Sequence, residues 1–134
     1  MGVSIDSKEV EANLAQFQKE LPSILEKGLE KACLIVENSA KQNCPVDDGQ
    51  LRQSISHTVK GTSGEVGTNV EYAPYVEVGT GIYSTEGGGR QTPWRYKDAK
   101  GEWHTTKGMR AQSFLRPALD KNRGKVLDCF KGLI

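Results

Sequence analysis

Cysteine, aspartate and glycine gather in residues 43–55, NCPVDDGQLRQSI, and a thiol beside carboxylates is one arrangement used for nucleophilic chemistry. Such a cysteine reacts as the thiolate, which requires a neighbouring base. No local rule of helix or strand geometry places either of the two histidines near Cys44. Proline instead biases the preceding residue out of helical geometry, and aspartate and glycine favour turns. We therefore predict a structural turn, formed by Pro45, Asp47 and Gly49.

The other chemistry-bearing residues do not converge on a site. Wide spacing argues against a CxxC metal site or a disulfide framework for the three cysteines, which are Cys33, Cys44 and Cys129. The glycine-rich segment 86–92, EGGGRQT, lacks the layout of a phosphate-binding loop. His57 falls on the apolar side of a predicted strand, which favours a packed, hydrogen-bonded histidine, and His104 is expected to be solvated. We predict no catalytic residue, no metal ligand and no cofactor.

The elements that position these residues begin with helix. Apolar residues recur at steps of three and four: Val10, Leu14, Phe17, Leu21, Leu25, Leu29, Ala32, Val36 and Ala40. This spacing gives a helix with one apolar face. Because Pro22 falls inside the pattern, we expect a broken helix. A first part would run from about Ser7 to Glu20 and a second from about Pro22 to Gln42, since proline is tolerated in a first turn.

A β-hairpin is predicted after Ser54, where the apolar period changes to two. Ile55, His57 and Val59 alternate with polar residues, residues 61–64 form a turn, and residues 65–68 return. The next segment, residues 72–78, fits either a short helix or a short strand. A last helix is expected to begin at Phe114-Leu115-Arg116-Pro117.

Residues 81–113 differ from the rest, because they are rich in glycine and basic residues and contain both tryptophans. Within them, residues 94–97 and 102–105 flank a turn at residues 98–101, which predicts an exposed two-stranded arm. From Arg90 to Arg116 there are seven Lys or Arg residues and two Asp or Glu residues. Long loops of this kind in small domains are usually functional or disordered.

Together these elements predict an α+β fold in a single domain, residues 1–134. A long broken N-terminal helix and a C-terminal helix would pack on an antiparallel sheet of three to five strands. Residues 81–113 would form an extended arm or flexible loop. The chain is polar for a compact domain, with 36% hydrophobic and 26% charged residues. We therefore expect part of it to become ordered only against a partner.

Whole-chain properties argue against several classes of protein. The formal net charge of +1 gives no global attraction to nucleic acid or to acidic membranes. No apolar run approaches the roughly 20 residues of a membrane span, so we predict no membrane partner. The N-terminus lacks the layout of a signal peptide, and the scattered cysteines suit reduced thiols. We expect synthesis in the cytoplasm.

The arm leaves two interpretations open. Its cations and aromatic residues alternate in the manner of a single-strand nucleic-acid binding surface: Arg90, Trp94, Arg95, Tyr96, Lys97, Lys100, Trp103, Lys107 and Arg110. Tryptophan and arginine are also enriched in protein interfaces. We favour an interface and keep a nucleic-acid-binding module at residues 90–110 as the alternative.

Three blocks, in order, carry a resemblance that covers residues 29–130. The first is Pro45-Val46-Asp47 with Gly49, Leu51 and Ile55; the second is Tyr72-Ala73 with Tyr75, Val76, Glu77, Gly79 and Thr80; the third is Phe114-Leu115-Arg116-Pro117-Ala118. The sequence resembles the small minor structural proteins of long-tailed double-stranded DNA bacteriophages. These are described as neck, tail-completion or minor tail-component proteins of the head–tail junction. The family usually has Thr or Ser where Asp48 stands, a departure that a turn tolerates.

The resemblance implies a non-enzymatic virion protein of a phage or prophage, made in the bacterial host cytoplasm. Its implied partners are copies of itself in a ring and other head–tail junction and tail proteins, with at most transient contact with passing DNA. Rings need heterologous contacts that close by rotation, and an exposed arm can order on a neighbour. The candidate interface residues are Tyr72, Tyr75, Glu77, Arg90, Trp94, Arg95, Tyr96, Trp103, Arg110, Phe114 and Arg116.

Overall fold

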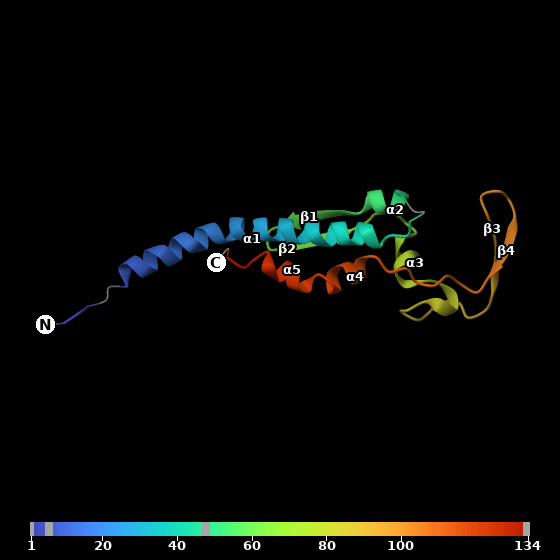
Figure 1. Cartoon of the computed structure of the whole chain (residues 1–134). Coiled ribbons are helices and arrows are strands. Elements are labelled where there is room, and N and C mark those ends of the chain that lie inside the picture. The colour runs from blue at the N-terminus through green and yellow to red at the C-terminus, as the bar shows by residue number, and fades with distance from the viewer. Residues whose placement is uncertain (1, 5–6, 47–48, 133–134) are drawn as a thin grey trace.

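The chain forms one long helix, several short helices and two β-hairpins, and the computed structural model describes residues 2–4, 7–46 and 49–132. In order the elements are α1 (Lys8–Asn43), α2 (Gly49–Ser54), β1 (Ser56–Lys60), β2 (Ser63–Gly67), α3 (Ala73–Val78), the 3-10 helix η1 (Gly81–Tyr83), β3 (Trp94–Lys97), β4 (Trp103–Thr106), α4 (Leu115–Asp120) and α5 (Arg123–Asp128). The molecule is elongated, with the start of α1 at one end and β3–β4 at the other (Figure 1). Helices and antiparallel hairpins together confirm the predicted α+β class.

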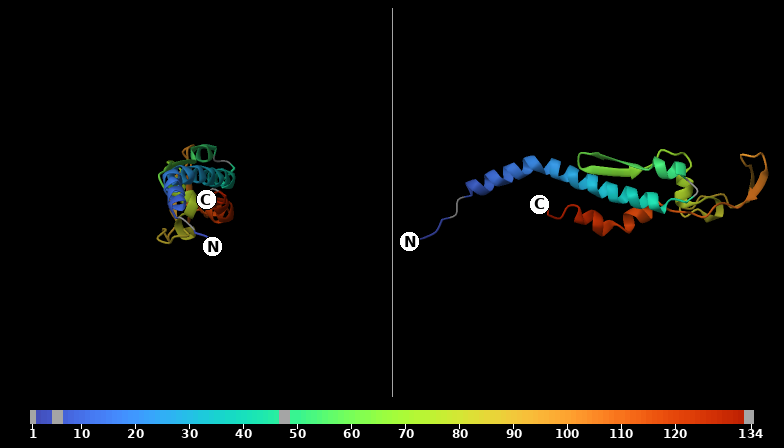
Figure 2. Two further views of the ribbon diagram at one scale, coloured as in Figure 1. Left: turned by 90° about the vertical axis from the view of Figure 1, so that its left-hand side faces the viewer. Right: turned by 45° about the horizontal axis from the view of Figure 1, so that its top comes forward.

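Helix α1 runs through Pro22 without interruption, so the predicted break is wrong. Its 36 residues make it about 54 Å long at 1.5 Å per residue. Proline removes one backbone donor and crowds the preceding turn, which favours a kink. Pro22 is exposed, so water can hydrate the carbonyl that loses its partner. The ribbon accordingly changes direction in its N-terminal half without ending (Figure 2).

Hairpin β1–β2 lies along the C-terminal half of α1 and confirms the strand pair predicted after residue 54. The strands are antiparallel, with Ser56 opposite Gly67 and Thr58 opposite Glu65. Close packing requires glycine at position 64, because a Cβ atom there would lie 2.5 Å from the Sγ atom of Cys33 on α1. Both figures place the hairpin on one side of α1 and the C-terminal helices on the other.

The core lies at the C-terminal end of α1, where four helices meet. Its buried residues are Val36, Ala40, Cys44, Leu51, Ile55, Ala73, Val76, Phe114 and Ala118. Phe114, Leu51 and Ile55 are the largest side chains that are fully buried. The predicted turn lies beside this core: α1 ends at Asn43, half-buried Pro45 follows, and α2 begins at Gly49, whereas Asp47 and Asp48 lie outside the described residues.

Two predictions about the remaining elements need correction. The described part of the chain has two separate two-stranded sheets, not one sheet of three to five strands. Strands β3 and β4 are exposed at nearly every position, so they have no apolar face to bury against the first sheet. The C-terminal helix is also divided, because α4 ends at Asp120 and α5 begins at Arg123. Asn122, between the two helices, departs from helical geometry with φ −111° and ψ 13°.

Candidate subunit-interface site

The β3–β4 hairpin forms the predicted two-stranded arm at one end of the molecule (Figure 1). Trp94 pairs with Thr106 and Lys97 pairs with Trp103 across the antiparallel ladder. One carboxylate holds the turn, since Oδ1 of Asp98 accepts hydrogen bonds of 2.9 Å from the backbone N–H groups of Lys100 and of Glu102. This Asx-type turn is fixed locally, without help from the core.

Cations and aromatic rings of the arm pair with one another. The guanidinium of Arg95 lies 5.2 Å from the ring centroid of Trp103. The guanidinium of Arg90 lies 5.8 Å from the ring of Trp94. Trp103 nevertheless remains 58% exposed. Exposed aromatic side chains beside arginine are typical of protein interfaces. These side chains remain accessible because β3 and β4 are exposed at nearly every position.

A stacked pair and an acidic group complete the arm tip. The rings of Tyr96 and His104 stack with centroids 5.3 Å apart, and Nε2 of His104 lies 2.7 Å from Oδ2 of Asp98. This hydrogen bond, followed by the backbone N–H of Glu102, holds the pKa of Asp98 below its usual range. Asp98, Glu102 and His104 lie close enough together to hold a metal ion. Both oxygens of Asp98 already serve the turn and the histidine, so the fold accounts for this cluster without an ion.

A backbone clasp fixes the base of the arm. The N–H of Thr80 donates to the carbonyl of Met109 at 2.9 Å, and the N–H of Ile82 donates to the carbonyl of Lys107 at 3.1 Å. The two segments approach so closely that a Cβ atom on Gly81 would collide with the carbonyl oxygen of Lys107. Gly81 also has a φ of 60°, which side-chain-bearing residues rarely adopt. The arm therefore leaves the body in a defined direction.

Glu77 joins α3 to the start of α4. Its Oε2 atom accepts hydrogen bonds from the backbone N–H groups of Phe114 at 2.8 Å and Leu115 at 2.9 Å, and its Oε1 atom accepts one from Arg116 at 2.9 Å. Its carbonyl accepts a 2.6 Å hydrogen bond from the hydroxyl of Ser113. A carboxylate here satisfies free backbone donors at a helix start. No local spacing signals this contact, because it joins segments that are far apart in sequence.

The remaining candidate interface residues differ in how far they are buried and in which element carries them. Phe114 is fully buried in the core, where its ring cannot face a neighbouring subunit. Tyr75 is 58% exposed, whereas Tyr72 is half-buried and packs against the core. Arg110 places its guanidinium 4.7 Å from the ring centroid of Tyr83, beside the arm's base. The structure therefore gathers the candidates of residues 90–103 on the arm and separates them from those of α3 and α4.

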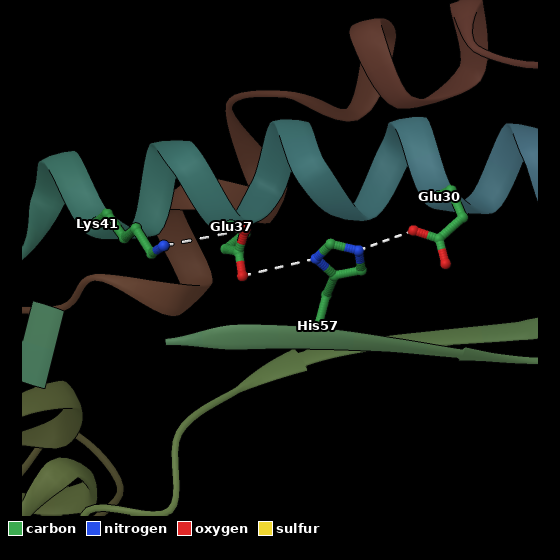
Figure 3. A network of polar contacts seen from close by, with 4 residues as sticks. All are labelled: Glu30, Glu37, Lys41 and His57. Carbon is green, nitrogen blue, oxygen red and sulfur yellow. Dashed lines mark hydrogen bonds and ion pairs between the residues drawn. The ribbon is translucent and has the colours of Figure 1, made fainter. Parts of the chain in front are cut away.

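His57 lies between α1 and β1 and confirms the packed, hydrogen-bonded histidine predicted from its strand position (Figure 3). Its Nε2 atom lies 2.9 Å from Oε2 of Glu30. Its Nδ1 atom lies 3.5 Å from Oε1 of Glu37, an ion-pair distance that is long for a hydrogen bond. The hydrogen bond with Glu30 is the main reason that the pKa of His57 is raised, despite opposing desolvation. The histidine thus serves to attach the hairpin to α1.

An open apolar groove runs between α1, β2 and the C-terminal helices, and sequence analysis did not anticipate it. Its volume is about 870 Å³. Apolar side chains line most of it: Leu29, Val36, Val66, Leu115, Leu119 and Val126. The charged residues that line it are Arg116, Arg123, Glu77, Glu86 and Asp120, of which Asp120 pairs with Arg123. The apolar face of α1 was predicted from the sequence, but the fact that the C-terminal helices cover it only in part was not.

A family model described as "Bacteriophage HK97-gp10, putative tail-component" matches residues 8–79, more than half of the chain. The chain belongs to this HK97-gp10-like family, which confirms the resemblance found in the sequence. No curated protein and no solved structure matched the chain. The matched region spans α1 to α3 and ends before the arm.

Proposed function

We propose that this protein is a non-enzymatic structural subunit of a phage or prophage virion, acting at the head–tail junction in neck or tail completion. Membership of a family of phage tail components is the observation that carries this proposal. The subunits assemble into a closed ring, and the ring joins head and tail proteins. The protein therefore resides in the virion after synthesis in the bacterial cytoplasm.

Features of the protomer support assembly over catalysis. The arm exposes Trp103 and Tyr96, and α1 exposes Val10 and Leu14. These large hydrophobic side chains are available for contacts with other subunits. A heterologous contact of such surfaces generates a ring when its rotation closes. The pKa of the Cys33 thiol is raised by burial and then by nearby carboxylates, which disfavours the thiolate that a nucleophile needs.

The distribution of charge suits a channel that DNA crosses. The whole chain has a formal net charge of +1, while the basic residues concentrate on the arm and near α4. A ring that gripped DNA with many cations would hold it, because phosphate contacts dominate affinity. Transient contact with passing DNA is compatible with this balance, and so is docking on acidic neighbours. Within the part of the chain that the structure describes, no helix has the length and apolar character of a membrane span.

Light scattering on the purified protein across a concentration series, with and without a single-stranded oligonucleotide, tests this proposal. The expected result is a mass that grows toward a closed ring without oligonucleotide and changes little when it is added. A monomer whose mass rises only with oligonucleotide at low salt would contradict the proposal and favour the arm at residues 90–110 as a nucleic-acid-binding module.

A further inference from the structure

The first half of α1 is an amphipathic helix whose apolar face is not buried by any of the residues that the structure describes. None of residues 8–27, all of which the structure describes, is buried. Val10 is 54% exposed and Leu14 is 57% exposed. The segment projects past both the hairpin and the C-terminal helices in Figures 1 and 2. Helices of this length are only marginally stable alone in water, so a partner for this face would stabilise it.

The charges on this segment are arranged around its apolar stripe. At 3.6 residues per turn, four apolar side chains fall on one face: Val10, Leu14, Phe17 and Leu21. Glu9 and Glu20 lie along one flank of the stripe, and Glu11 lies along the other. Lys8 and Lys19 lie on the opposite face. The two flanks of the apolar stripe, which would border a partner's surface, are therefore acidic.

The groove is open and mainly apolar, and the wall formed by the C-terminal helices carries Arg116 and Arg123. Glu77 and Glu86 also line the groove, and the carboxylate of Glu77 is bonded to three backbone N–H groups. The segment 115–128 contains four basic and two acidic residues, and one of the acidic residues, Asp120, pairs with Arg123 at 3.0 Å. An apolar stripe spaced i, i+4, i+7 and i+11 that enters an apolar groove is a common mode of helix recognition. Basic residues beside the groove would face the acidic flanks of the stripe.

The chain cannot fill this groove with its own helix start. Leu29 and Val36 of α1 form part of the groove wall, and α1 continues without a break from residue 8 to these residues. A continuous helix holds its first turns away from a site beside its own later turns. The occupant must come from another molecule, and the apolar stripe with acidic flanks is present in every copy of this chain.

We propose that the first half of α1, residues 8–21, binds in the apolar groove of a second copy, with its glutamates facing Arg116 and Arg123. Stripe and groove are different surfaces displaced along α1, so the contact is heterologous and passes from copy to copy. This is the type of joint that a ring requires. The inference rests on the self-assembly in the proposed function and specifies which surfaces carry it.

Charged substitutions on the two surfaces test the joint. Leu14→Glu places a charge in the stripe, and Ala12→Glu, on the opposite helix face, is the matched control. Leu119→Glu places a charge in the groove at a side chain that is 43% exposed, so the fold should tolerate it. Light scattering should show self-association weakened at least about tenfold by Leu14→Glu and by Leu119→Glu. Ala12→Glu should behave as the wild type, and circular dichroism should confirm that all variants remain folded.

Mixing the Leu14→Glu and Leu119→Glu variants gives a more specific test. The Leu119→Glu copy retains an intact stripe and the Leu14→Glu copy retains an intact groove, so the mixture should form a heterodimer that cannot extend. Assembly of Leu14→Glu equal to that of the wild type, or the absence of the heterodimer, would overturn the inference while leaving the proposed function in place. A wild type that stays monomeric at every concentration would contradict the self-assembly of the proposed function, and the inference with it.

Discussion

The carboxylate of Glu77 is predicted to hold α4 in place, and Glu77→Ala removes it. In the native protein the carboxylate accepts three backbone hydrogen bonds of 2.8 to 2.9 Å from Phe114, Leu115 and Arg116. Truncation leaves these N–H groups without their acceptor at the start of a short helix. Phe114 belongs to the core, so any loosening here also affects packing.

The size of the stability loss depends on how well water can replace the carboxylate as a hydrogen-bond acceptor. The contacts to Phe114 and Leu115 are partly buried, whereas that to Arg116 is exposed and water can take it over. Loss of a capping acceptor costs about 1 kcal/mol, and loss of a favourable charge at a helix start costs up to about 1 kcal/mol more. With the partly buried amide of Phe114 left unsatisfied, we expect Glu77→Ala to lower the free energy of unfolding by about 2–3 kcal/mol.

Urea denaturation followed by circular dichroism measures this loss. Glu71→Ala is the matched control, because Glu71 is an exposed glutamate just before α3. We expect the control to lie within about 0.5 kcal/mol of the wild type. The free energy of unfolding of Glu77→Gln should fall between those of Glu77→Ala and the wild type, because the amide retains one acceptor oxygen but loses the charge. A Glu77→Ala variant as stable as the Glu71→Ala control would refute the role of Glu77 as the acceptor that holds the start of α4.

Three further predictions concern pH, the base of the arm and its rings. Because the folded-state pKa of His57 is raised, its ion pairs stabilise fully below the unfolded value of about 6.5, and this stabilisation is lost as pH rises through the folded value. The stability difference between wild type and His57→Gln, on the order of 1 kcal/mol in acid, should therefore shrink in alkaline urea titrations; a constant difference would contradict it. Gly81→Ala should increase proteolytic cleavage within the arm, because its Cβ atom meets the carbonyl of Lys107; unchanged digestion would contradict the clasp. Trp94→Ala and Trp103→Ala should leave the circular dichroism spectrum intact but lower the assembled mass in light scattering, and an unaltered mass would exclude the arm as a subunit contact.

Local sequence signals predicted the hairpins well. Alternation around His57 and the turn at residues 61–64 indicated β1 and β2, and the glycine of Asp98-Ala99-Lys100-Gly101 indicated the arm's turn. These features depend on residues that are close in sequence. Hydrophobic periodicity likewise indicated the apolar face of α1 on both sides of Pro22.

Features that depend on distant residues could not be predicted in this way. Whether Pro22 ends a helix depends on solvent access to one carbonyl and on packing farther along α1. The capping role of Glu77 depends on residues 114–116, which reach it only after the fold forms. Phe114 was named among the candidate interface residues, but the fold places it in the core.

Deletion of the gene from the phage or prophage that encodes it, followed by electron microscopy of the particles released, tests the central claim most directly. The account predicts filled heads and separate tails that fail to join, with joining restored when the protein is supplied from a plasmid. Complete particles with heads attached to tails in the absence of the protein would contradict its assignment to the head–tail junction.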